Sequence, residues 1–225
     1  MKPAPIGAVL IDLDGTLLDT APDLAAAANA TLRDLQLAAL DPAAIREFVG
    51  KGIVVLMQRS LQAALGRAPD DALAEEARQL FTAHYERVNG SASSLFPGVV
   101  EGLGRMREQG LRLACVTNKV ERFTLPLLAK AGLDRSFDAI VTSDNAGARK
   151  PDPAIVLHAC RLLAVPPAGA CMIGDSDNDG EAARAAGCRF LLVPYGYREG
   201  RALGEIACDA VVADLLEAAE RLKAS

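Results

Sequence analysis

The sequence predicts an α/β fold in which helices cover both faces of a parallel sheet and a separate helical insertion follows the first strand. Short aliphatic runs alternate with helical segments through most of the 225 residues. Residues 18–94 interrupt this alternation, because they contain no convincing buried strand. Apolar residues make up 51% of the chain, which is enough to build a substantial core.

The first expected strand covers residues 8–13, a continuous aliphatic run that Asp14-Gly15-Thr16 ends. A short run without polar alternation is typical of a strand buried on both faces. Four later segments have the same character and are expected to be strands: residues 111–117, 138–143, 170–174 and 189–193.

Helices are expected between these strands, at residues 98–109, 120–131, 153–163 and 177–186. Gly110, Gly132 and Gly187 directly follow three of them, where a glycine commonly ends a helix. This succession of strands and helices predicts a parallel sheet.

The insertion is expected to form helices at residues 22–35, 42–48, 53–65 and 71–88. Their apolar residues recur at helical spacing, as Ile45, Phe48 and Val49 do. We therefore expect residues 1–17 and 95–225 to form the core and residues 18–94 a helical cap domain. Ligands of open parallel sheets bind at the carboxyl ends of the strands. An insertion that leaves from such an end can cover the ligand as a lid.

Charge and cysteine content limit the classes of function. The formal net charge is −5 and no block of like charge occurs, which argues against nucleic acid and membrane surfaces as partners. No stretch approaches the ~18 apolar residues of a membrane helix. The five cysteines form no CxxC pair and are expected to be buried free thiols. The sequence therefore predicts a cytoplasmic protein, and leaves open whether it is a monomer or a homodimer.

Two acids close the first strand, Asp12 and Asp14. Residues two apart on an extended strand share one face, so both carboxylates can reach one site. Buried acids of this kind require cations nearby. The alternative is an ordinary Asp-Gly turn that closes the strand.

Two further polar segments follow later in the chain. Thr117 and Asn118 end the second strand, and their hydroxyl and amide groups can donate to phosphate oxygens. They can equally be a helix N-cap. Lys150 precedes Pro151 where a loop leads into a helix, and it can equally be a solvated surface charge.

The last polar segment, residues 174–179, reads Gly-Asp-Ser-Asp-Asn-Asp and follows the aliphatic run ending at Ile173. Carboxylate oxygens at a strand end suit Mg²⁺. Acids are also favoured at a helix N-terminus by the helix dipole, so this alternative stays open.

The four segments together resemble the motifs of the haloacid-dehalogenase superfamily of phosphohydrolases, in the same order and at the same strand ends. This resemblance implies a three-layer Rossmann-like core with a C1-type cap. Residues 19–24, 48–52, 96–98, 117–119 and 195–197 further resemble bacterial phosphoglycolate phosphatases. Two places depart from that pattern: Lys51 stands where asparagine is common, and Arg198-Glu199-Gly200 follows Tyr197 where Asn-Tyr/His-Gly is more usual.

The resemblance implies a role for each motif residue. Asp12 would be the nucleophile and a ligand of Mg²⁺, and Asp14 the general acid–base, with its carbonyl on the metal. Asp175 would complete the metal ligands and Asp179 would support them. The phosphate would be bound by Thr117, Asn118 and Lys150.

The expected substrate is a small phosphorylated metabolite, with phosphoglycolate first. Sugar phosphates, pyrophosphate and a phosphosugar mutase reaction remain alternatives. A signalling receiver domain also phosphorylates an aspartate, but it is about half this length and lacks the helical insertion. Lys51 lies in the cap between Gly50 and Gly52, where a mobile cation and helix N-terminal amides could bind a second anionic group of the substrate.

Overall fold

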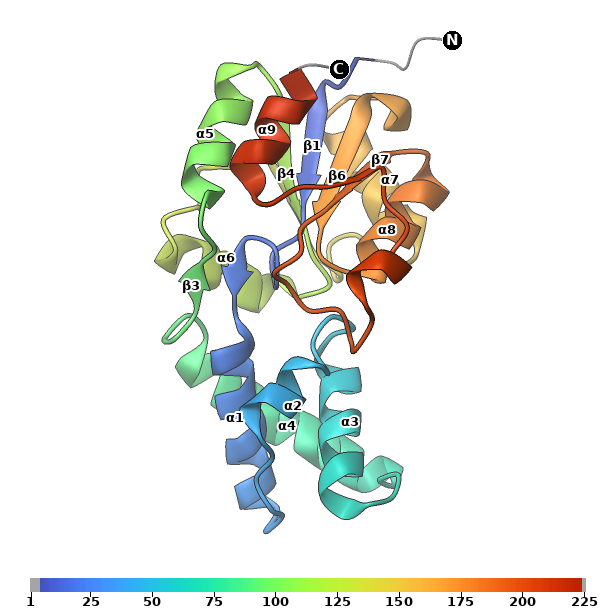
Figure 1. The fold of residues 1–225 in the computed structure, drawn as a ribbon. Coiled ribbons are helices and arrows are strands. Elements are labelled where there is room, and N and C mark those ends of the chain that lie inside the picture. Colours follow the sequence, from blue (N-terminus) through green and yellow to red (C-terminus); the bar gives the residue numbers. More distant parts are fainter. Residues whose placement is uncertain (1–4, 224–225) are drawn as a thin grey trace.

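The computed structural model describes residues 5–223, so residues 1–4 and 224–225 of the expected core domain lie outside the described part. Its centre is a parallel six-stranded sheet in the order β5-β4-β1-β6-β7-β8 (Figure 1). The strands are β1 (Ala8–Ile11), β4 (Arg112–Val116), β5 (Ala139–Val141), β6 (Ala170–Gly174), β7 (Arg189–Leu192) and β8 (Ala210–Val211). All five expected strands are present, and β8 was not expected.

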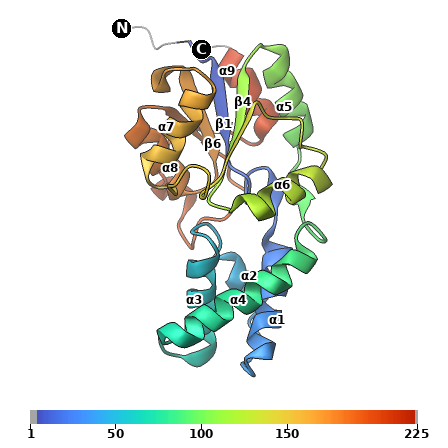
Figure 2. The same ribbon diagram turned by 180° about the vertical axis from the view of Figure 1, so that it is seen from behind.

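Helices form the outer two layers. Figure 2 shows α7 (Pro153–Leu162) and α8 (Asp177–Ala186) on one side of the sheet, and α5 (Val99–Glu108) and α9 (Leu215–Lys223) on the other. The helix α6 (Glu121–Lys130) packs on the same core cluster as α5 and α9. Short 3₁₀ turns occur at Pro167–Gly169 and Leu203–Glu205. The predicted three-layer α/β fold is confirmed, and α9 is an addition to the expected helices.

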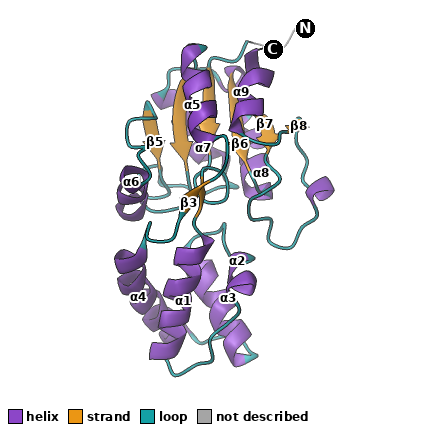
Figure 3. Cartoon of the chain, turned by 60° about the vertical axis from the view of Figure 1, so that its left-hand side comes forward, coloured by secondary structure: helices purple, strands orange, loops and turns teal. Residues whose placement is uncertain are grey.

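The insertion folds into four helices with their own core. These are α1 (Ala21–Asp34), α2 (Pro42–Arg46), α3 (Ile53–Leu65) and α4 (Asp71–Val88). The buried side chains that join them include Leu32, Ile45, Leu61 and Phe81. Figures 1 and 3 show this helical body below the end of the sheet toward which β1 points. The expected lid position at the carboxyl ends of the strands is therefore the observed one.

The chain enters and leaves the insertion through a small antiparallel ribbon. It pairs β2 (Leu18–Asp19) with β3 (Ser94–Leu95). Residues 18–94 were expected to hold no convincing buried strand, and this ribbon of two-residue, partly exposed strands was not foreseen, because strands this short leave no periodic pattern in a sequence. The boundaries of the cap domain at residues 18 and 94 stay a prediction. Within residues 5–223, no helix is long and apolar enough to cross a membrane.

A buried carboxylate ties the two connecting segments together. Asp23, in the first turn of α1, is 1% exposed. It accepts the backbone N–H groups of Gly90, Ala92 and Ser93 at 2.8–3.1 Å and the hydroxyl of Ser93 at 2.5 Å. Residues 90–93 are thereby fixed against the helix that begins the cap.

We predict that Asp23→Ala lowers the free energy of unfolding by at least about 2 kcal/mol, because several buried donors lose a charged acceptor. Urea denaturation measures this change. Glu76→Ala, an exposed acid on α4, is the matched control and should stay within about 0.5 kcal/mol of the unmodified protein. Equal stability of the two variants would contradict the role given to Asp23.

Candidate active site

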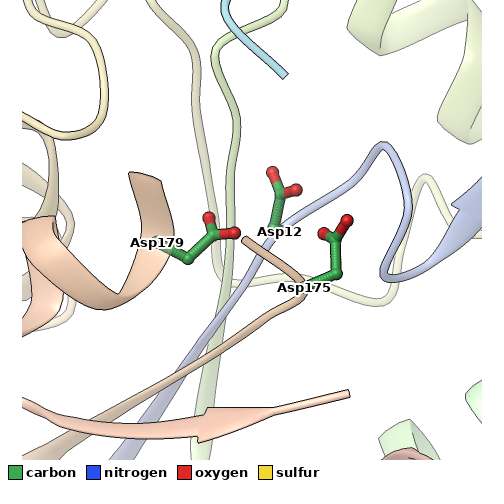
Figure 4. Close-up of side chains that lie close together, drawn as sticks. All are labelled: Asp12, Asp175 and Asp179. Carbon is green, nitrogen blue, oxygen red and sulfur yellow. The ribbon is translucent and has the colours of Figure 1, made fainter. Parts of the chain in front are cut away.

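Neighbouring strands of the sheet bring the motif acids together. Asp12 follows β1, and Asp175 follows β6, which pairs directly with β1. Asp179 lies in the first turn of α8. Figure 4 shows the three carboxylates directed toward the same region. One oxygen of each lies within 4.8 Å of the others, so these buried side chains could hold a metal ion.

Asp175 is enclosed on both sides by glycine backbone. A methyl group added at either Gly15 or Gly196 would overlap the side chain of Asp175. One carboxylate oxygen accepts the hydroxyl of Thr16 at 2.8 Å, and the other accepts the N–H of Tyr197 at 2.5 Å. These contacts fix the direction in which the carboxylate points.

Burial opposes the negative charge of this cluster. It raises the pKa of Asp12 to about 7, against the lowering effect of Lys150, and the charge of Asp179 adds to the rise. Burial, together with the charges of Asp179 and Asp12, raises the pKa of Asp175 well above its ordinary value. The three buried carboxylates lie close together, and one ammonium group, that of Lys150, contacts two of them, Asp12 and Asp179. A divalent cation among their oxygens therefore fits both the charge and the ligand type.

Lys150 is the positive charge inside the cluster. Its Nζ donates to Asp12 Oδ1 at 2.5 Å, to Asp179 Oδ1 at 2.7 Å and to the carbonyl of Val116 at 2.8 Å. Asp179 is held by the N–H and the hydroxyl of Ser176, which both donate to its other oxygen. The structure thus places Lys150 beside the expected nucleophile, and Asp179 orients it.

Thr117 and Asn118 follow β4 and line the same pocket. The hydroxyl oxygen of Thr117 accepts the N–H of Lys119 at 3.1 Å. The side-chain amide of Asn118 donates to the carbonyls of Gly50 and Lys150, and its oxygen accepts the N–H of Lys150. In this structure the Asn118 side chain therefore connects the cap loop to the Lys150 segment, instead of presenting its donors to a phosphate.

The carboxylate of Asp14 lies apart from the three converging carboxylates of Asp12, Asp175 and Asp179. Its Oδ1 accepts the hydroxyl of Thr20 at 2.6 Å and lies 2.9 Å from the ammonium of Lys119. This acid lines the pocket but is not one of the three whose oxygens converge. Asp14 therefore lies at the pocket wall, beside Thr20 and Lys119.

Sequence reasoning gave Lys119 no role. Burial disfavours its charge, but the carboxylate of Asp14 and the hydroxyl of Tyr85 outweigh this effect and raise the pKa of Lys119 above its usual range. Tyr85 belongs to α4 of the cap, and its hydroxyl oxygen accepts a hydrogen bond from Lys119 Nζ at 2.9 Å. The position of Lys119 after Thr117-Asn118 was the only sequence signal, because its partners lie far away along the chain.

The pocket lies between the cap and the carboxyl end of the sheet. Its floor holds the core acids and Lys150, and its cap side is mostly apolar, with Leu24, Val49, Ile53 and Leu56. Gly50 and Gly52 line it, whereas Lys51 is 3.2 Å from Glu199 in an ion pair that Arg59 shares. The structure thus brings Lys51 to the seam between cap and core but pairs it with a core acid.

Comparison with known proteins agrees with this geometry. The family haloacid dehalogenase-like hydrolase matches residues 6–187. A protein of Nitrosospira multiformis named phosphoglycolate phosphatase is 49% identical over 99% of this chain and 98% of its own. One of Thiobacillus denitrificans with the same name is 47% identical over 96% of each chain.

Solved structures show the same fold. A crystal structure from Haemophilus somnus 129PT, described as a predicted phosphoglycolate phosphatase, superposes with a TM-score of 0.90 at 29% identity and covers 96% of this chain and 97% of its own. CbbY from Rhodobacter sphaeroides, solved in complex with phosphate, superposes with a TM-score of 0.75 at 25% identity and covers 94% and 96%. With the motif acids at the matching strand ends and this agreement along its length, the chain belongs to the haloacid dehalogenase-like hydrolases.

Proposed function

We propose that the protein is a Mg²⁺-dependent phosphatase of small phosphate monoesters, with 2-phosphoglycolate as its substrate. The observation that carries the reaction class is the pairing of Asp12 with Lys150 at 2.5 Å, beside converging carboxylates and with Asp14 on the pocket wall. The substrate rests on the names of the relatives, which are nearly half identical over nearly the whole chain.

In the first chemical step, Asp12 attacks phosphorus and the bond from phosphorus to the ester oxygen breaks. Asp14 gives its proton to that oxygen, so glycolate leaves with a neutral hydroxyl group instead of an alkoxide. Water then attacks the aspartyl-phosphate while Asp14 takes up a proton from the water. This step releases inorganic phosphate and regenerates the Asp12 carboxylate. The ammonium of Lys150 balances charge on Asp12 and on the transferring phosphoryl group throughout.

Asp12 and Asp175, with the carbonyl of Asp14, would hold Mg²⁺, and Asp179 would support them. Bound Mg²⁺ supplies charge neutralisation between the carboxylate and the phosphate dianion. Thr117 and backbone amides after β1 and β4 would meet the phosphoryl oxygens. We further propose a cytoplasmic protein, a monomer or homodimer without nucleic-acid or membrane partners, in keeping with its five free cysteines and its dispersed charge.

We predict that Asp12→Asn abolishes turnover and leaves the fold intact, because the amide has nearly the same shape but is a poor nucleophile. Phosphate release measures the activity, and thermal unfolding checks the fold. Release at the rate of the unmodified enzyme would falsify the covalent mechanism.

Asp14→Asn should instead show a loss that depends on the leaving group. An alkyl phosphate needs its leaving oxygen protonated and should lose roughly 10²–10⁴-fold in kcat. The first step with p-nitrophenyl phosphate needs no such proton, so the burst of p-nitrophenol should be far less affected. Equal losses of this first step for the two esters would remove Asp14 from the general-acid role.

Removal of metal ions tests the proposed cofactor. Dialysis against EDTA should abolish activity, and added Mg²⁺ should restore it. Ca²⁺ should inhibit, since it accepts more ligands and can take both oxygens of Asp12. Full activity of the metal-free protein in excess EDTA would contradict the assignment.

A further inference from the structure

Lys119 is a buried cation in the wall of the pocket. It lies on the loop that leaves β4, directly after Thr117 and Asn118, and is 9% exposed. An ammonium group carries three N–H donors. One faces Asp14 Oδ1 at 2.9 Å and one faces the hydroxyl of Tyr85 at 2.9 Å. The third has no acceptor within residues 5–223, and the pocket that Lys119 lines is where such an acceptor would bind.

The other cations near the pocket differ from Lys119. Lys150 is also buried, but protein acceptors take its three donors. Lys51 is paired with Glu199. Arg78, Arg122 and Arg149 also line the pocket. The side chains of Arg78 and Arg122 are at least 40% exposed and contact glutamates of α4, and Arg149 is exposed as well. Among the described residues, Lys119 combines burial with an available donor.

The contact with Asp14 fixes where that donor can act. Asp14 has to reach the ester oxygen that leaves with the alcohol. In 2-phosphoglycolate a single methylene separates this oxygen from the carboxylate. A substrate whose ester oxygen meets Asp14 therefore carries its carboxylate toward the ammonium 2.9 Å from that same acid.

The surroundings favour a charged contact there. The ring of Tyr85 lies 5.0 Å from Lys119 Nζ and covers it from the cap side. Hydrogen bonds between charged partners are shorter and stronger than neutral ones, and exclusion of water strengthens them further. A carboxylate that enters this part of the pocket thus meets a cation that is already dehydrated and held in place.

We infer that Lys119 binds the carboxylate of the substrate and is the residue that distinguishes a carboxylated phosphate ester from an uncharged one. This inference rests on the proposed function, since it names how the same pocket selects 2-phosphoglycolate. It also assigns the choice of substrate to Lys119 in the loop after β4, held in place by Tyr85 of the cap, instead of to Lys51.

Binding of two non-hydrolysable analogues tests it by isothermal titration calorimetry in the presence of Mg²⁺. The analogues are 3-phosphonopropionate, which carries the carboxylate, and propylphosphonate, which has a methyl group in its place. The unmodified protein should prefer the carboxylated analogue by roughly 10- to 150-fold, the range of one hydrogen bond to a charged group. Lys119→Met keeps the length of the side chain and should remove most of this preference.

Two variants serve as matched comparisons. Lys51→Ala removes the other candidate cation and should keep the preference. Tyr85→Phe removes one partner of Lys119 but not its charge, and should also keep it. Thermal unfolding checks each variant, and Lys119→Gln replaces Lys119→Met if the latter does not fold.

Three results would overturn the inference: equal binding of both analogues by the unmodified protein, an unchanged preference in the Lys119 variant, or loss of preference in Lys51→Ala alone. Weakening of both analogues by the same factor leaves the preference unchanged, and would show that Lys119 only positions Asp14. Failure of the proposed function is a different observation: the unmodified enzyme would not hydrolyse 2-phosphoglycolate, whatever the binding ratio.

Discussion

The buried charge at the carboxyl edge of the sheet is the constraint on which the rest of the site depends. Asp12 and Asp179 share the ammonium of Lys150, whose third donor reaches the carbonyl of Val116 on β4. Buried carboxylates are costly unless they are paired. Three adjacent strands must therefore end at the same level, and the loop that carries Lys150 must return to them. Asn118 holds that loop by accepting the N–H of Lys150 and donating to its carbonyl.

Asp12 and Asp175 could be predicted because each directly follows a strand that the sequence marks clearly. A short aliphatic run gives the strand, and the parallel order brings the strand ends together. The shorter elements could not be predicted in this way. The strand β8 has only two residues, and the apolar run around it, residues 210–213, is shorter than those of the predicted strands. The helix α9 carries a signal that was overlooked, since Leu215, Ala218, Ala219 and Leu222 recur at helical spacing and are all buried.

Contacts between cap and core were beyond the reach of sequence reasoning, because they join residues far apart along the chain. The two departures from the phosphoglycolate phosphatase pattern illustrate this. Lys51 in the cap loop and Glu199 in the core loop after β7 lie 3.2 Å apart as an ion pair. Arg59 and Asn178 also contact Glu199, at 2.6 and 3.2 Å. Lys51 and Glu199, each unusual at its position, thus neutralise each other between cap and core. The cation in the cap loop is therefore already paired with a protein carboxylate.

How deeply a cationic side chain is buried decides how strongly it can discriminate between ligands. A half-exposed lysine loses little when a substrate lacks the matching anion, because water replaces the contact. Lys119 is almost fully buried and is covered by Tyr85, so a ligand without a carboxylate leaves a charged donor with poorer solvation. A site built to hydrogen-bond one group rejects analogues that lack it more strongly than an apolar pocket rejects a change in size. Because Lys119 also contacts Asp14, the cation that we infer to select the substrate lies beside the acid that we propose to protonate its leaving group. Selection and chemistry in this pocket therefore depend on the same few buried atoms.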